Sequence, residues 1–258
     1  MPPRARAQLA RANFEQFKTW SPEVNINALM IVKRASEPIE QTICRYADHE
    51  GVDLIACGSK ALNPENVASC SVVDTLKTTG CSVLVSKSGI RSKNLLESSQ
   101  TMGHGHAPTG RQQQGLSVSI LVDEHFEDCL RFTMNFFNDK ERDSLSLLRL
   151  TKRSDLPDQT LEHFRVIQRC EQLCCASQCA RADGGGGGYG LVSVVNNVVT
   201  TMKDSTGNGT TEVASHVQNS EVGLLVIALP SAAGVSEFVT DILVKATCPI
   251  LFVRPSGN

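Results

Sequence analysis

The sequence predicts an α/β protein made of two doubly wound parallel-sheet domains in tandem, the first of which is truncated. A repeat is the main observation, because Val52–Ser86 is echoed by Val222–Val253, and each copy runs from apolar strand through loop, helix and cysteine to a second apolar strand. A repeat of this length indicates duplication. The predicted strands are also continuous apolar runs, which is typical of parallel sheets covered by helices on both faces.

The repeat and a change in composition predict three regions. Residues 1–87 form a partial domain that lacks the first two strands of the plan, and residues 115–258 form a complete domain. Between them, residues 88–114 are rich in Ser, Gly, Gln and Lys and show no periodicity, so we expect a flexible linker.

The first half contains only the last three strands of the plan. In doubly wound sheets of order 2-1-3-4-5 or 3-2-1-4-5 the first strand lies inside the sheet, so its absence leaves backbone groups that need partners. Three explanations stay open: a truncated gene model, direct pairing of the remaining strands, or a strand borrowed from a partner. The expected elements are a helix at Arg4–Thr19, a strand at Ala28–Lys33, a helix at Glu37–His49, a strand at Val52–Cys57, a helix at Val67–Thr78 and a strand at Ser82–Ser86.

The second half alternates strands and helices throughout, which predicts a complete doubly wound domain. Its glycine run at 184–188 follows a helix and enters a strand, the reverse of a phosphate-binding loop. The expected strands are Ser117–Asp123, Ser144–Leu150, Leu191–Val195, Gly223–Leu229 and Ile250–Val253, and the expected helices are Glu124–Asn138, Pro157–Arg181, Thr211–Asn219 and Ser236–Thr247.

Composition limits the classes of function. The 258-residue chain has a formal net charge of −2, so no basic field favours nucleic acid as a partner. Its longest apolar run, Val222–Leu229, is too short to span a membrane. Ten cysteines without a secretory signal favour a reducing compartment, and we expect the cytoplasm. Because Arg4, Arg6 and Arg11 precede the first acidic residue, mitochondrial targeting is the alternative.

Four segments carry a resemblance to a known family: DLIACGS at Asp53–Ser59, GCSVLV at Gly80–Val85, Val122–Asp123, and TCPILFV at Thr247–Val253. Together with the repeat, these segments resemble the universal stress protein family in tandem arrangement. The resemblance implies a Rossmann-like fold. It also implies either an ATP site, built from a loop G-x-x-G, nine residues and G-S or G-T, with an Asp after the first strand, or a non-binding member that lacks this loop.

The first half departs from the nucleotide-binding loop. Gly58 and Ser59 match its start, but Ala61 stands where the second glycine belongs, and the loop is about two residues short. No aspartate corresponds to the family's Asp, because the first strand is missing. Gly58 is equally consistent with a tight turn between strand and loop.

The second half departs from the loop in a different way. Ala228 replaces the first glycine, Gly234 is the loop's only glycine, and Ser236 and Glu237 stand where Gly-Ser belongs. A carboxylate at Glu237 would repel phosphates. Asp123 keeps the position of the family's Asp, but a turn or helix-cap role explains it equally well.

A cluster of cysteines in the predicted helix 157–181 has the spacing C-x3-CC-x3-C. One helix cannot place all four thiols around a single metal ion, so packing against the sheet is the simpler interpretation and a thiol or metal sensor is the alternative. The four residues are Cys170, Cys174, Cys175 and Cys179.

The resemblance, with its degenerate loops, implies a non-catalytic, stress-related regulatory protein that acts through protein association and needs no cofactor. The chain has no motif that pairs a nucleophile with a base, so we do not expect an enzyme. The resemblance also implies self-association or intramolecular pairing of the last strands, Ser82–Ser86 against Ile250–Val253, and an unpaired apolar edge would invite such association. The main alternative is a switch that binds ATP or AMP through Asp123, Gly234 and Ser236.

Overall fold

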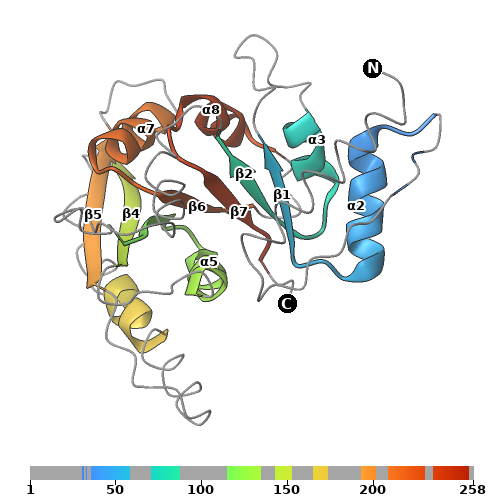
Figure 1. The fold of residues 1–258 in the computed structure, drawn as a ribbon. Helices are drawn as coiled ribbons and strands as arrows, with labels where there is room; N and C mark the ends of the chain where they lie inside the picture. The colour runs from blue at the N-terminus through green and yellow to red at the C-terminus, as the bar shows by residue number, and fades with distance from the viewer. Residues whose placement is uncertain are drawn as a thin grey trace, which may run out of the picture.

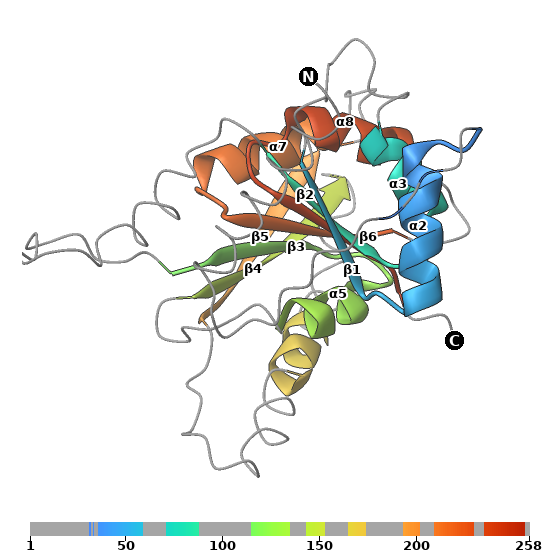
Figure 2. The ribbon, with the colours of Figure 1, turned by 45° about the vertical axis from the view of Figure 1, so that its right-hand side comes forward.

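A computed structural model describes residues 31, 33, 36–58, 71–87, 115–134, 143–152, 165–173, 193–201, 209–229 and 235–255. These residues form one seven-stranded sheet of order β1-β2-β7-β6-β3-β4-β5, with helices on both faces (Figures 1 and 2). The strands are β1 Leu54–Gly58, β2 Ser82–Ser86, β3 Ser117–Leu121, β4 Ser144–Lys152, β5 Ser193–Thr201, β6 Leu224–Ala228 and β7 Ile250–Val253. The helices are α2 Ile39–Glu50, α3 Ser71–Thr78, α5 Phe126–Thr133, α7 Thr210–Asn219 and α8 Glu237–Lys245, and residues 165–173 are also helical.

The second half confirms the predicted doubly wound α/β fold. Its five strands are parallel and lie in the order β5-β4-β3-β6-β7, which is 3-2-1-4-5 when they are numbered within the half. The chain therefore reverses its direction across the sheet between β3 and β6. In open α/β sheets, ligands bind outside the carboxyl ends of the strands at such a switch point.

The two halves meet through their last strands, as expected. β2 pairs antiparallel with β7, and Leu84 lies opposite Leu251. These two leucines occupy the same place in the two copies of the repeat. The copies are therefore related by a local two-fold axis at this pair, and they contribute to one continuous sheet.

Most elements lie where the sequence places them, and Gly51 ends α2 in the left-handed conformation (φ 63°) that glycine adopts without strain. The C-terminal end predicted for the strand Leu191–Val195 was wrong. β5 continues to Thr201 because it pairs with β4 along its whole length, from Ser144 opposite Ser193 to Lys152 opposite Thr201. Pairing with a long neighbour overrides the poor strand propensity of the two asparagines inside β5.

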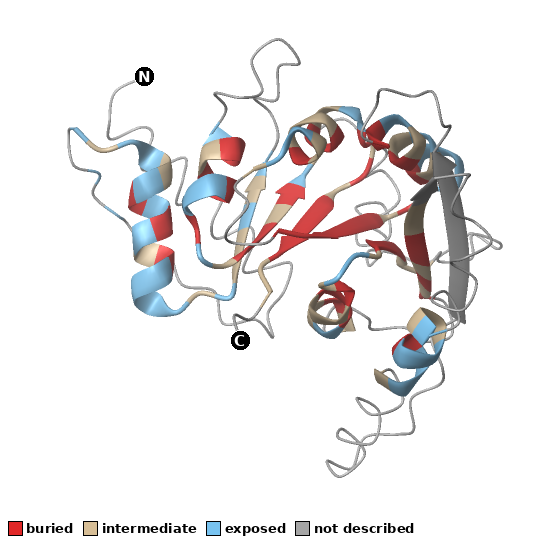
Figure 3. Cartoon of the chain, turned by 180° about the vertical axis from the view of Figure 1, so that it is seen from behind, coloured by how far each residue is buried: buried red, intermediate tan, exposed pale blue. Residues whose placement is uncertain are grey.

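Two apolar clusters cover the two faces of the sheet. On one face, side chains of α3, α7 and α8 pack on the sheet around Phe252 and Leu225. On the other, α5 and residues 165–173 pack on Ile120, Leu147 and Leu251. Figure 3 shows the buried residues concentrated on the central strands. The core is aliphatic, as the composition indicates.

The first half is incomplete on its outer side. In the second half, β6 is followed by β3, with Leu225 opposite Ser119. The corresponding edge of β1 has no strand beside it in the described part of the chain. Ile43 on α2 is 38% exposed, whereas its repeat equivalent Val213 on α7 is 0% exposed. Among the described residues, α2 therefore lacks the sheet that covers the inner side of α7.

Several expected segments are not tested. The helix at Arg4–Thr19 and the linker 88–114 lie outside the described residues. Of the strand expected at Ala28–Lys33, only residues 31 and 33 are described, and neither lies in a strand. No helix within the described ranges is long and apolar enough to cross a membrane.

Candidate functional site

The candidate site lies at the switch point, where β3 and β6 end side by side. These strands are parallel neighbours, so their carboxyl ends lie on the same edge of the sheet. Asp123 follows the end of β3 by two residues, and Ala228 is the last residue of β6. The loop that contains Gly234 lies outside the described residues, which resume at Val235, just before α8.

Asp123 supports the turn that leads into α5. Its Oδ1 accepts a hydrogen bond of 2.8 Å from the backbone N–H of His125, and its carbonyl oxygen accepts one of 3.3 Å from Phe126. The residue is exposed, but desolvation by its neighbours raises the pKa of the Asp123 carboxyl against the opposing effect of the His125 N–H. The turn role suggested for this residue is therefore present, and one carboxylate oxygen is engaged in it.

Ser236 begins α8 as its N-cap. Its hydroxyl accepts a hydrogen bond of 3.3 Å from the backbone N–H of Val239, which satisfies one of the free donors of the first turn. Glu237 follows as the first helical residue, and its side chain is exposed. A carboxylate here interacts favourably with the positive end of the helix and competes with any phosphate for that position.

The first half supplies only a fragment of such a site. Gly58 is the exposed last residue of β1, and Ser59 lies outside the described residues. A Cβ atom added at Gly58 would meet the Ser86 hydroxyl at 3.8 Å, an ordinary contact, so packing does not require glycine there. In the described part of the chain, no strand that could carry an aspartate lies next to β1. The Ser86 hydroxyl near Gly58 donates a hydrogen bond of 3.3 Å to the carbonyl oxygen of Cys57.

The cysteine cluster is described only at its start. Cys170 is completely buried in the cluster around Ile120, together with Cys129. This placement confirms the packing interpretation for Cys170, whereas Cys174, Cys175 and Cys179 lie outside the described residues. Within the described part of the chain, no group of three or more His, Cys, Asp or Glu side chains is placed to hold a metal ion.

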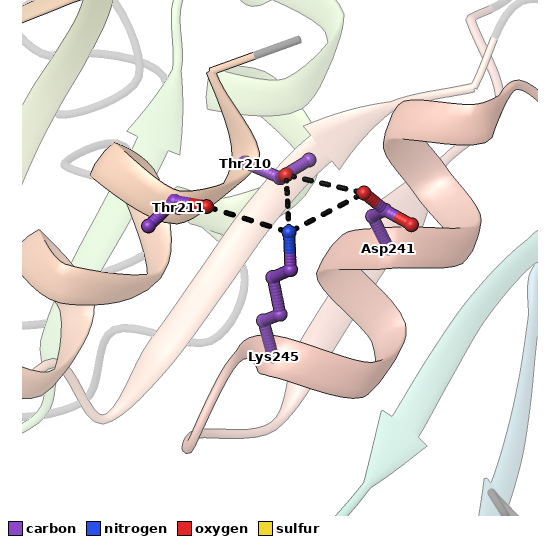
Figure 4. A network of polar contacts seen from close by, with 4 residues as sticks. All are labelled: Thr210, Thr211, Asp241 and Lys245. Carbon is purple, nitrogen blue, oxygen red and sulfur yellow. Dashed lines mark hydrogen bonds and ion pairs between the residues drawn. The ribbon is translucent and has the colours of Figure 1, made fainter. Parts of the chain in front are cut away.

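The sequence analysis missed a polar network that joins α7 to α8 (Figure 4). The Lys245 ammonium group donates to the hydroxyl groups of Thr210 and Thr211, at 3.1 and 3.4 Å, and lies 3.4 Å from the Asp241 carboxylate. Thr210 also donates to Asp241 at 3.4 Å. The network closes on itself and connects the first turn of α7 to the last two turns of α8, so it is a structural connection. The i,i+4 spacing of Asp241 and Lys245 was its only signal in the sequence.

The sequence analysis also missed two basic residues beyond the last strands. Lys87 donates a hydrogen bond to the carbonyl oxygen of Leu243, and Arg254 donates one to that of Leu76. Each residue follows the last strand of its own half and contacts a helix of the other half. The signal for these contacts in the sequence was that Lys87 and Arg254 occupy equivalent positions in the repeat.

Comparisons with known proteins agree on the fold. No model of a protein family matches the chain, and no curated protein matches it either. The structure of a universal stress protein from Archaeoglobus fulgidus aligns with 99% of this chain and 81% of its own length, with a TM-score of 0.57 at 10% identity. A functionally unknown protein from Pseudomonas aeruginosa aligns with 95% of this chain and 77% of its own, with a TM-score of 0.52 at 14% identity. The chain therefore has the α/β fold seen in a universal stress protein.

Proposed function

We propose that this chain is a universal-stress-protein-like regulatory protein of the stress response, which is not an enzyme and acts through protein association in the cytoplasm. The proposal rests on the hydrogen bonds that the polar groups at the switch point already make within the protein. Asp123 accepts the N–H of His125, and Ser236 caps α8. Both groups therefore already serve the local structure.

The rest of the nucleotide loop supports the same proposal. Ala228 replaces a glycine at the end of β6, which restricts the approach of a phosphate to the backbone. The Glu237 carboxylate at the start of α8 would add a repulsion on the order of 1 kcal/mol or more against a bound phosphate. These residues favour a site that has lost nucleotide binding.

Nucleotide analysis tests this part of the proposal. Purified protein is denatured and assayed for released adenine nucleotide, and the folded protein is titrated with ATP and AMP in a thermal-shift assay. Because a ligand that binds only the native state raises the melting temperature, we expect no released nucleotide and no saturable shift. A saturable shift that Asp123→Ala abolishes and the exposed neighbour Glu124→Ala retains would overturn it.

The surface for association lies at the β1 end of the sheet. β1 (LIACG) carries no charge and no proline, the features by which edge strands avoid pairing with other chains. Ile39 and Ile43 on the nearby helix α2 are 54% and 38% exposed. We expect a second copy of the chain to pair here, because two identical edges can meet about a two-fold axis as β2 and β7 do.

Sedimentation velocity over a range of concentrations tests self-association. We expect the unmodified chain to dimerise, and Ala56→Lys, which places a charge on an exposed position of β1, to remain monomeric. Gln218→Lys is the control, because it changes an exposed residue of α7 at a distance from this edge. A chain that is monomeric at every concentration, or a dimer that tolerates Ala56→Lys, would reject this surface.

A nucleotide-binding switch is the second candidate. The exposed position of Asp123 at the switch point favours it, because ligands bind there in this class of fold and only one oxygen of the carboxylate accepts from His125. In that case Asp123→Asn, which keeps the oxygen that accepts from His125, would weaken ATP or AMP binding and leave the melting temperature of the free protein unchanged.

A further inference from the structure

Two cysteines of the first half lie at the turn that ends α3. The Thr79 hydroxyl lies 2.9 Å from the sulfur of Cys81 and accepts a hydrogen bond of 3.2 Å from the Cys81 backbone N–H. The Cys44 thiol donates a hydrogen bond of 3.9 Å to the carbonyl oxygen of Thr75, which also accepts one of 2.9 Å from the backbone N–H of Thr79. From this arrangement, we propose that Cys44 and Cys81 form a redox-active dithiol that closes reversibly into a disulfide.

The turn that carries Cys81 is held against α2 by a second contact. The Asp48 carboxylate accepts a hydrogen bond of 3.3 Å from the backbone N–H of Gly80. Asp48 lies one helical turn after Cys44, so both side chains are on the same side of α2. The helix that carries Cys44 and the turn that carries Cys81 are therefore already in contact.

The two thiols differ in accessibility, and this difference assigns their roles. Cys44 is completely buried, and burial raises the pKa of its thiol. Cys81 is half-buried, so it is the sulfur that an oxidant reaches. Cys81 would react first, and Cys44 would resolve the oxidised product.

A hydroperoxide is the class of oxidant that completes the reaction. The Cys81 sulfur attacks the terminal peroxide oxygen, the O–O bond breaks, and a sulfenic acid forms with release of water or an alcohol. The Cys44 sulfur then attacks the sulfenic sulfur. The S–S bond forms, the S–O bond breaks, and the hydroxyl group leaves as water with the proton of Cys44. The two thiols lose two electrons, and the peroxide gains them.

The second half is an internal control. Cys248 is the repeat equivalent of Cys81, but Ala214 stands at the position of Cys44. Cys248 is only 3% exposed, and burial raises the pKa of its thiol to about 11. The second copy therefore has a shielded cysteine without a partner thiol, whereas the first has a reachable cysteine with one. This site is separate from the cluster at 170–179, and it does not depend on the proposed function.

The consequence of the disulfide concerns α2. This helix packs on α3, and the described residues place no sheet beneath it like the one beneath its counterpart α7. A covalent bond between Cys44 and Cys81 would join α2 to the start of β2. Oxidation would therefore fix a helix that bears the exposed Ile39 and Ile43 beside the open edge of the sheet.

Peptide mapping under non-reducing conditions tests the proposal. The folded full chain is treated with a small excess of hydrogen peroxide, alkylated, digested and analysed by mass spectrometry. We expect a peptide pair joined through Cys44 and Cys81 that dithiothreitol removes, while Cys248 is recovered as the alkylated thiol. Absence of this pair from folded protein whose Cys81 is oxidised would overturn the proposal, as would its formation only in denaturant.

Two variants separate the steps. Cys44→Ala copies the residue of the second half, and we expect it to accumulate a Cys81 sulfenic acid that dimedone traps. Cys81→Ser is expected to lose both the disulfide and the trapped adduct, whereas Cys248→Ser retains the disulfide. Dimedone labelling of Cys81 that is equal in Cys44→Ala and in the unmodified chain would count against Cys44 as the resolving thiol. Should a variant fail to fold, the peptide map of the unmodified chain still tests whether the disulfide forms.

Discussion

Lys87 and Arg254 make the same contact in opposite directions across the junction of the two halves. Lys87 follows β2 and donates to the carbonyl oxygen of Leu243 in α8, whereas Arg254 follows β7 and donates to that of Leu76 in α3. Leu76 and Leu243 are themselves equivalent in the repeat. Each cation meets the last turn of a helix, where free carbonyl groups and the helix dipole favour positive charge. The junction therefore rests on these contacts as well as on the β2–β7 pairing.

Removing the Arg254 side chain is expected to destabilise the fold. Arg254→Met loses the contact with Leu76 and a hydrogen bond of 3.1 Å to the carbonyl oxygen of Leu229. Because hydrogen bonds to charged groups contribute about 1.5–3 kcal/mol each, we expect the free energy of unfolding to fall by about 3 kcal/mol or more in urea denaturation. Lys77→Met, which removes a half-exposed partner of Asp74, is the control and should change it by less than about 0.5 kcal/mol. Equal effects of the two substitutions would contradict this role of Arg254.

A charge placed in the β2–β7 pairing is expected to disrupt the junction unequally on its two sides. Leu251 is completely buried and Leu84 is half-buried, although the two face each other. Leu251→Lys should therefore cost more than about 3 kcal/mol and unfold much of the protein, and Leu84→Lys should cost less. Thermal unfolding measures the stability of each variant, and sedimentation measures its compactness and oligomeric state. Unchanged melting and sedimentation in both variants would show that this pairing does not join the halves.

The repeat offers a matched test of the incomplete first half. Val213→Ala removes completely buried methyl groups from α7 and should lower the free energy of unfolding by about 2 kcal/mol. Ile43→Ala removes more atoms at the equivalent position of α2, yet it should cost less than about 1 kcal/mol because Ile43 is exposed. Chemical denaturation of both variants measures the two losses in the free energy of unfolding. A larger loss for Ile43 would mean that a further element covers α2.

His216 is expected to make stability depend on pH. Its Nε2 is buried without a hydrogen-bond partner among the described residues, and burial lowers the pKa of the imidazole. The unfolded chain then takes up the proton first, so stability is lost as the pH falls through about 6.5, the ordinary value. Between pH 7.5 and 5.5, the free energy of unfolding should fall more in the unmodified chain than in His216→Gln. Parallel pH profiles for the two proteins would exclude this effect.

Local pattern was sufficient to predict much of the fold. The bounds of Ser82–Ser86 and Ile250–Val253 are confirmed without change, because short apolar runs between turns and helices are visible in the sequence itself. The candidate site was predicted less well. Asp123 and Ser236 lie at the expected end of the sheet, but their side chains hold local turns and caps. Such hydrogen bonds depend on backbone geometry that residue identity does not reveal.

The sequence by itself determined the alternation of helices and strands and the duplication, because periodicity and repetition are local properties of the chain. Only the tertiary structure decided which order the strands take, how far β5 extends along β4, and which distant groups meet. Lys87 and Leu243 meet although they are widely separated along the chain, as do Arg254 and Leu76, and Cys44 and Thr75. Their contacts arise from the packing of two halves about one axis and of α2 upon α3, and packing is a property of the whole fold.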